Sequence, residues 1–157
     1  MIIKWKSLII NILIPIVVGL LSAISTKDSM DIYKDIILPP LSPPSFLFPM
    51  VWTILFILIG IASYVIWEST NVDIEKKKTA FTLYGLDLIV NFIWTIVFFN
   101  LRNYDFSVFI IIMLLLIIVA NIFSFGSISK RAAWLLVPYL MWVSFATYLN
   151  IAIAVLN

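Results

Sequence analysis

The chain contains no cysteine and no histidine among its 157 residues. Disulfides, thiol chemistry and Cys/His zinc sites are therefore excluded, and so is acid–base catalysis by an imidazole. Charged residues make up only 11% of the chain and the net charge is +2. We therefore expect no metal site and no nucleic-acid partner. The chemistry that remains is that of aromatic rings, amides, hydroxyls and a few isolated carboxylates.

Apolar residues, in contrast, make up 64% of the chain, more than a soluble domain of this length could cover with polar groups. A membrane-spanning helix needs about 20 predominantly apolar residues. Five stretches meet this requirement: 7–26, 45–67, 79–100, 104–125 and 132–156. The segments between them are short, except for 27–44, and no internal repeat is visible. We predict an all-α integral membrane protein, a five-transmembrane-helix bundle that forms a single domain over 1–157.

The basic residues are divided unequally between the two ends of these spans. Seven fall on the side of the N-terminus, whereas only Lys27, Lys34 and Arg102 fall on the other side. The seven are Lys4, Lys6, Lys76, Lys77, Lys78, Lys130 and Arg131. Lys and Arg concentrate on the cytoplasmic side of membrane proteins. We therefore expect a bacterial-type cell membrane protein with a cytoplasmic N-terminus, and with the C-terminus and the 27–44 segment outside.

Three tryptophans, Trp52, Trp94 and Trp142, lie inside the spans rather than at their ends. Polar and small residues accompany them at helical spacing, which predicts faces turned toward other helices. The first span carries Asn11, Pro15, Gly19 and Ser22; the third carries Asp87, Asn91, Trp94, Thr95 and Phe98; the fifth carries Pro138, Trp142, Ala146, Asn150 and Ala154. The aliphatic span 104–125 has no such stripe in its first half, so we expect it to be the most exposed to lipid. For Gly19, Gly60 and Ala154 we favour close helix packing over a ligand contact.

The three inner tryptophans are expected to reach similar depths in the bilayer. Trp52 lies about one and a half turns into its helix, or roughly 10 Å at the helical rise. These depths predict an aromatic cavity in the outer half of the membrane. The proline-rich segment 27–44 would roof this cavity and act as a lid.

Asp87 is the one carboxylate that its position places inside a span. Intramembrane carboxylates are costly and are by default candidates for function. Its depth, about two turns below Trp94, leaves three interpretations open: a structural hydrogen bond to another helix, access to water from the inner side, or contact with a ligand.

Three segments resemble the TspO/MBR family. The run from Leu38 to Phe56, LPPLSPPSFLFPMVWTILF, resembles the family's loop and second-helix signature. The run from Asn91 through Trp94 to Phe99 resembles its third-helix motif, and PYLMWVSFATYLN at 138–150 resembles its fifth-helix motif. The resemblance covers essentially the whole chain. One departure is Leu38, which stands where the family often has Lys.

The resemblance implies a five-helix protein, usually a homodimer, that binds porphyrins and related tetrapyrroles such as protoporphyrin IX, with no other cofactor required. The positions that match the family's pocket residues are expected to bind the ligand, and we add neighbouring residues of the same motifs. The candidate ligand-binding residues are Tyr33, Pro43, Pro44, Trp52, Phe56, Asn91, Trp94, Phe98, Trp142, Ala146 and Asn150.

Three functions remain open from the sequence. The first is a membrane receptor or sensory protein that binds a flat apolar tetrapyrrole. The second is a light- and oxygen-dependent enzyme that degrades porphyrin; no acid–base pair or nucleophile is present, so Trp52 and Trp142 would be the candidate catalytic residues. The third is a tetrapyrrole transporter, against which the absence of a visible repeat weighs.

Overall fold

The computed structural model describes residues 3–29 and 31–157 and shows a bundle of five long helices. Its elements are α1 (Trp5–Thr26), the short 3₁₀ turn η1 (Lys27–Ser29), the short α2 (Ile32–Asp35), α3 (Leu47–Glu68), α4 (Ile74–Thr95), the π-helical turn η2 (Ile96–Asn100), α5 (Tyr104–Gly126) and α6 (Lys130–Leu156). No strand occurs among the described residues. All five long helices are long and apolar enough to cross a membrane, which confirms the predicted fold class.

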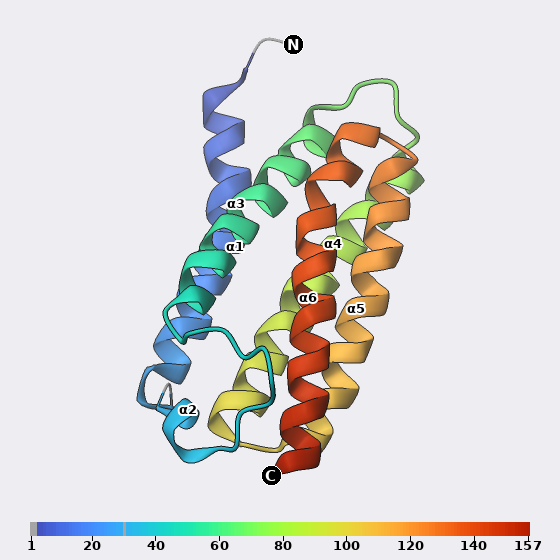
Figure 1. The fold of residues 1–157 in the computed structure, drawn as a ribbon. Helices are drawn as coiled ribbons and strands as arrows, with labels where there is room; N and C mark the ends of the chain where they lie inside the picture. The colour runs from blue at the N-terminus through green and yellow to red at the C-terminus, as the bar shows by residue number, and fades with distance from the viewer. Residues whose placement is uncertain (1–2, 30) are drawn as a thin grey trace.

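The long helices form an incomplete ring. Close packing joins α1 to α3, α3 to α6, α6 to α5 and α5 to α4, whereas α1 touches α4 at fewer places. The N-terminus and the C-terminus lie at opposite ends of the bundle (Figure 1). The segment with η1 and α2 crosses the bundle at the same end as the C-terminus. The loosest packing in the ring is between α1 and α4, and this part of the bundle borders the site described below.

The helix boundaries follow from local sequence. Asp73 accepts a hydrogen bond from the backbone N–H of Glu75 and starts α4 five residues before the predicted span. Asn103 accepts from the N–H of Phe106 and starts α5. Side-chain oxygens at this position satisfy N–H groups that a helix start leaves free. The added first turn of α4 contains Lys76, Lys77 and Lys78 and therefore projects out of the apolar span.

Helices α1 and α3 approach each other closely at Gly60. A Cβ atom at this position would lie 2.5 Å from Cα of Ile12 and 2.9 Å from the carbonyl oxygen of Asn11. Pro15 follows Asn11 by four residues and has no N–H to give to that carbonyl. Gly60 thus packs directly against the backbone of α1, which leaves no room for a side chain. The expectation that Gly60 serves helix packing is confirmed.

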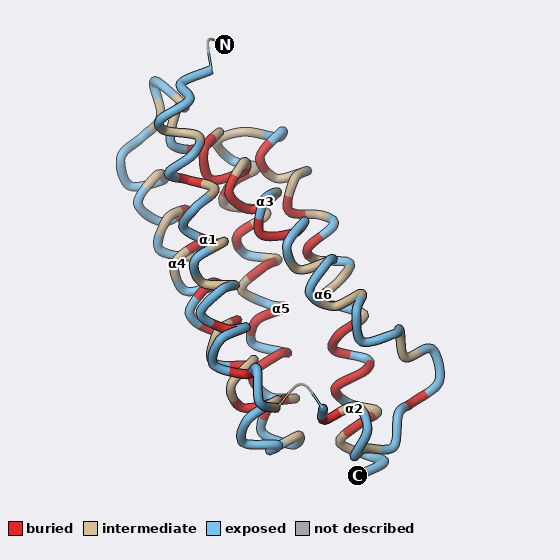
Figure 2. The backbone as a smooth tube through the Cα atoms, turned by 90° about the vertical axis from the view of Figure 1, so that its left-hand side faces the viewer, coloured by how far each residue is buried: buried red, intermediate tan, exposed pale blue. Residues whose placement is uncertain are grey.

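The most lipid-exposed helix is α1. The prediction that the span 104–125 is the most lipid-exposed is therefore wrong. In the most apolar part of each helix, 17% of the residues of α1 are buried, compared with 33% of those of α5 (Figure 2). The reason is that α5 packs between α4 and α6. Aliphatic side chains suit both lipid and helix interfaces, so a purely aliphatic stretch does not distinguish the two.

The last turn of α4 widens into the π-helical turn η2. The backbone N–H of Leu101 donates to the carbonyl of Ile96, five residues earlier. A π turn accommodates one additional residue within a helix. It places Phe99 beside Phe98, with ring centroids 4.9 Å apart, and it brings Asn100 to α1, where its amide donates to the carbonyl of Ser25.

The segment 27–44 is attached to the rest of the bundle at several points. The Asn157 side chain donates to the carbonyl of Ile37 and accepts from its N–H, at 3.1 and 2.8 Å. The Tyr148 hydroxyl donates to the carbonyl of Pro40 at 3.0 Å. Arg102 pairs with Asp35 at 3.2 Å. The segment is therefore held to the C-terminal end of α6 and to the loop after η2.

Replacing Asn157 with Ala removes both hydrogen bonds to Ile37. We expect amide hydrogen exchange at residues 36–38 to accelerate about tenfold, since two exposed hydrogen bonds together contribute on the order of 1.4 kcal/mol. Exchange measured by mass spectrometry in detergent micelles tests this. The loop at 70–73, at the opposite end of the bundle, serves as the internal control. Unchanged exchange at 36–38 would show that Asn157 does not hold the segment.

Candidate ligand-binding site

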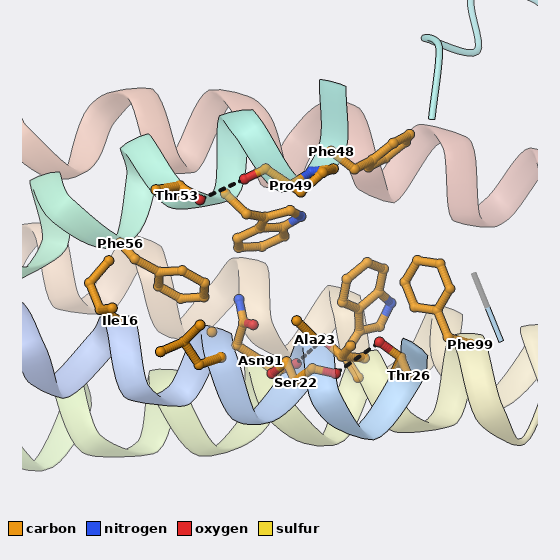
Figure 3. A pocket seen from close by; sticks show the side chains of 15 residues that line it. Ile16, Ser22, Ala23, Thr26, Phe48, Pro49, Thr53, Phe56, Asn91 and Phe99 are labelled. Carbon is orange, nitrogen blue, oxygen red and sulfur yellow. Dashed lines mark hydrogen bonds between the residues drawn. The ribbon is translucent and has the colours of Figure 1, made fainter. Parts of the chain in front are cut away.

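A cavity of about 370 Å³ lies between α1, α3 and α4, toward the end of the bundle that carries α2 (Figure 3). Its lining is almost entirely apolar, with a few hydroxyl groups and one amide. The lining residues are Ile16, Gly19, Leu20, Ser22, Ala23, Thr26, Phe48, Pro49, Trp52, Thr53, Phe56, Asn91, Trp94, Thr95 and Phe99. This volume lies within the range of about 300–1,000 Å³ that is usual for small-molecule pockets, near its lower limit.

Two tryptophans from facing helices form the aromatic wall. The ring centroids of Trp52 on α3 and Trp94 on α4 lie 6.3 Å apart, with the rings tilted by 36°. Phe56 extends this wall at 5.5 Å from Trp52, and Phe98 supports Trp94 from behind at the same distance. Such rings offer a flat apolar ligand both faces and edges for contact.

Helix α1 and the ring of Phe56 meet at one end of the cavity. A Cβ at Gly19 would lie 2.6 Å from the ring of Phe56, so only glycine lets this ring rest against α1. Figure 3 shows Phe56 and Ile16 at one end of the cavity, and Thr26 and Phe99 at the other. Gly19 therefore serves helix packing, as predicted, and also shapes the cavity.

The cavity opens between α1 and α3. The exposed lining residues are Leu20 and Ala23 on α1 and Pro49 and Thr53 on α3, whereas the lining residues of α4 are buried or half-buried. These exposed positions belong to helices that span the membrane. A ligand dissolved in the lipid would therefore meet the opening directly.

Four of the eleven predicted binding residues line the cavity: Trp52, Phe56, Asn91 and Trp94. Two others lie directly behind Trp94. Phe98 stacks on its ring, and Asn150 accepts a hydrogen bond from its indole N–H at 2.9 Å. These two hold the aromatic wall in place without lining the cavity.

The remaining five predicted residues do not line the cavity. Pro43 and Pro44 precede α3, and Tyr33 packs edge-on against Phe48, with ring centroids 5.5 Å apart. Burial raises the pKa of Tyr33 to about 12. No described residue of 27–44 lines the cavity, and a role for this segment as a lid stays a prediction.

The prediction that Trp52 and Trp142 face one space is wrong. Phe48 stands between them: it lines the cavity and packs edge-on against Trp142, with centroids 5.7 Å apart. Trp142 instead lines a separate, shallower hollow on the outer surface of α3 and α6, together with Phe145. Ala146 is buried and lines neither space. The predicted stripe on the fifth span is correct at Ala146 and Asn150, which are buried, but Pro138 is exposed, because Tyr139 and Val143 occupy the inward face there.

Asp87 is fully buried and makes a structural hydrogen bond, the first of its three interpretations. The Tyr139 hydroxyl donates to Asp87 Oδ1 at 2.9 Å, and Asn91 Nδ2 donates to the Tyr139 oxygen at 3.1 Å. Asp87 itself does not line the cavity. It is connected to the cavity through Tyr139 and Asn91.

Most of the α1 residues that line the cavity were not predicted from the sequence. Ile16, Leu20, Ala23 and Thr26 line the cavity, and none of them was a candidate. The polar stripe on the first span did identify the correct face, because Ser22 belongs to it and Thr26 follows one turn later. Apolar positions on a lipid-exposed helix carry no signal that separates a cavity from the bilayer.

Residues 11–156 match the TspO/MBR family. The chain is 39% identical to the tryptophan-rich protein TspO of Archaeoglobus fulgidus over 96% of both chains. It is 36% identical to the tryptophan-rich protein TspO of Chlorobaculum tepidum over 87% of this chain and 85% of that protein. It is 28% identical to the translocator protein of Bos taurus over 93% of this chain and 87% of that protein. The family match extends over nearly all of the five-helix bundle, and the chain belongs to the TspO/MBR family.

Proposed function

We propose that the protein is a membrane sensory protein that binds porphyrins, such as protoporphyrin IX, and related tetrapyrroles. The observation that carries this proposal is the pair of indole rings, Trp52 and Trp94, in an apolar cavity that opens to the bilayer. A flat apolar ligand gains affinity from contacts with aromatic rings and from leaving water. A relative from Cereibacter sphaeroides, 30% identical over 80% of this chain, is named a tryptophan-rich sensory protein.

The size of the cavity indicates how a macrocycle would bind. At about 370 Å³ the space suits part of a tetrapyrrole. One edge of the ring would lie against the wall that Trp52 and Phe56 form, and the rest would extend through the opening between α1 and α3. Polar substituents on the protruding edge could then reach the membrane interface.

The orientation predicted from charge belongs to this proposal. The start of α1, the α3–α4 loop and the α5–α6 loop share one end of the bundle (Figure 1). This end carries seven of the ten Lys and Arg residues. We place it in the cytoplasm, which puts the ligand cavity in the outer half of the membrane.

Titration with protoporphyrin IX tests the proposal. In detergent micelles the wild-type protein should shift the main porphyrin absorption band and saturate at one porphyrin per chain. Replacing Trp52 with Phe should weaken binding about tenfold, because it removes an indole N–H and part of the aromatic area. Replacing Trp142 with Phe is the matched control and should leave the affinity within about twofold of wild type.

Two results would contradict this proposal. One is a wild-type protein that does not saturate, since an apolar ligand would then be partitioning into the micelle. The other is a larger loss in the Trp142 variant than in the Trp52 variant, since the ligand would then occupy the outer hollow on α3 and α6.

Light-dependent degradation of porphyrin is a second candidate function, favoured by one observation. Trp52 and Trp94 both line the cavity, so a porphyrin bound there would lie against easily oxidised indole rings, and molecular oxygen would be the oxidant that its breakdown consumes. The same samples, illuminated in air, distinguish the functions. For the enzyme, the Trp52→Phe protein should lose bleaching activity even when it is saturated with porphyrin. Equal bleaching of saturated wild-type and variant proteins would support binding alone.

A further inference from the structure

The hydroxyl groups that line the cavity share one hydrogen-bonding arrangement: each donates its proton to a carbonyl four residues earlier in its own helix. The bonds run from Ser22 to Val18 at 2.9 Å, from Thr26 to Ser22 at 2.8 Å, from Thr53 to Pro49 at 2.7 Å and from Thr95 to Asn91 at 3.0 Å. Figure 3 draws the bonds from Thr53 to Pro49 and from Thr26 to Ser22. A hydroxyl has a single proton. These four groups therefore offer a ligand only their acceptor lone pairs.

The amide of Asn91 adds a fifth acceptor. Asn91 Nδ2 donates to the Tyr139 oxygen at 3.1 Å, so the side-chain carbonyl oxygen of Asn91 points away from Tyr139. Among the described residues, none donates a hydrogen bond to this oxygen. Figure 3 shows the amide of Asn91 directed into the cavity. A ligand in the cavity would therefore meet a free carbonyl oxygen at this position.

Asp87 sets the direction in which Asn91 is held. The Tyr139 hydroxyl gives its only proton to Asp87 Oδ1 at 2.9 Å, so its oxygen can only accept from the amide of Asn91. A carboxyl group keeps an accepting oxygen in either protonation state. The other titratable group beside Asp87 is Tyr84, one turn away on α4, and no basic side chain in the described part of the chain pairs with Asp87.

The donors in the cavity are few. The indole N–H of Trp94 is already bound to Asn150 at 2.9 Å. The indole N–H of Trp52 makes no hydrogen bond to any described residue, so it is available to a ligand. The lining therefore presents one donor, the Trp52 N–H, and five acceptors, which are the four hydroxyl oxygens and the Asn91 side-chain carbonyl. The polar groups of the lining are thus strongly biased toward acceptors.

We propose that the cavity selects ligands that donate hydrogen bonds from N–H or O–H groups, and that Asp87 is the positioning residue that maintains this preference through Tyr139. The proposal rests on the function proposed above and refines it. A cyclic porphyrin turns its N–H groups toward the centre of the ring. Open-chain pyrrole compounds carry N–H groups at an edge, where the acceptors of the cavity can reach them, and are the favoured ligands within the tetrapyrrole class.

A pair of two-ring compounds tests this. A dipyrrinone, which is half of an open-chain tetrapyrrole, has two N–H donors, and its N,N′-dimethyl derivative has none. We expect the wild-type protein to bind the N–H compound about tenfold more tightly, as one net hydrogen bond would give. The measured quantity is the ratio of the two dissociation constants, from absorbance titrations in the same detergent.

Three variants separate positioning from general structure. Asn91→Leu removes the acceptor, and Asp87→Leu frees the Tyr139 proton to bind the Asn91 carbonyl; both should reduce the ratio to about 1. Asp87→Asn retains an oxygen that accepts from Tyr139 and should restore most of the preference. Damage to the fold would instead lower both affinities together and leave the ratio unchanged.

The outcomes distinguish this inference from the proposed function. If protoporphyrin IX binds but wild type shows no preference between the two dipyrrinones, the inference is wrong and the proposed function stands. A preference that persists in both leucine variants also overturns it. If neither protoporphyrin IX nor the dipyrrinones bind, both proposals are wrong.

Discussion

Replacing Gly60 with Ala is expected to destabilise the protein by about 3 kcal/mol, at the upper end of the cost of overpacking. The added methyl group would meet the backbone of α1 at Ile12 and Asn11, with contacts as short as 2.5 Å. No flexible side chain is available to move, so α1 itself must shift away from α3. Thermal unfolding followed by near-UV circular dichroism should show a midpoint lowered by about 6–12 °C.

Gly85 provides the matched control. It also lies within a membrane helix, α4, but nothing lies within 4 Å of a Cβ placed there. Gly85→Ala should leave the unfolding midpoint unchanged or raise it slightly, since Ala favours a helix by up to about 1 kcal/mol over Gly. Equal effects of the two substitutions would show that helix propensity, rather than the approach of α1 to α3, determines the result at Gly60.

Replacing Ala23 with Phe should reduce the affinity for protoporphyrin IX by about 10- to 100-fold, as overpacking of 1–3 kcal/mol in an occupied site would. Ala23 lies at the opening of the cavity, where a phenyl ring would take the place of the ligand. Because Ala23 is exposed, the substitution should not disturb the packing of the bundle. Porphyrin titration and thermal unfolding of the same preparation measure both quantities.

Ala120→Phe is the control for the added bulk and hydrophobicity. Ala120 is exposed on α5 and lines neither the cavity nor the outer hollow. Its variant should bind porphyrin with wild-type affinity. A similar loss in both variants would indicate that the added ring changes how porphyrin partitions into the micelle, and would remove the support for a ligand between α1 and α3.

The sequence predicted the spans because their signal is length and apolar composition, which the membrane itself imposes. It also predicted the inward face of α4, where Asn91 and Trp94 follow helical spacing. Polar and aromatic residues at that spacing are informative, since lipid does not favour them. The predicted spans agree with the helices to within a few residues, apart from the charged first turn of α4.

The positions of Trp142 and of the α1 lining were not predictable in the same way. Helical spacing gives the direction of a Cα–Cβ bond but does not say which neighbouring ring fills the space beyond it. Phe48 fills that space, and this separates Trp142 from Trp52. On α1, Leu20 and Ala23 suit lipid, a helix interface and a cavity wall equally well. Only the arrangement of three helices decides among these.

The π turn η2 gives this chain one place where its length can change at little cost to the bundle. Elsewhere in a span, deletion of one residue turns everything that follows by about 100° and exposes the inward face to lipid. Within Ile96–Asn100 a deletion would convert the wide turn to an ordinary α-helical one and leave Trp94 and α5 in place. The loss would be confined to Phe99 and to the contact of Asn100 with α1. Lineages of this protein could therefore gain or lose one residue here, and so alter one wall of the cavity, without rebuilding the membrane helices.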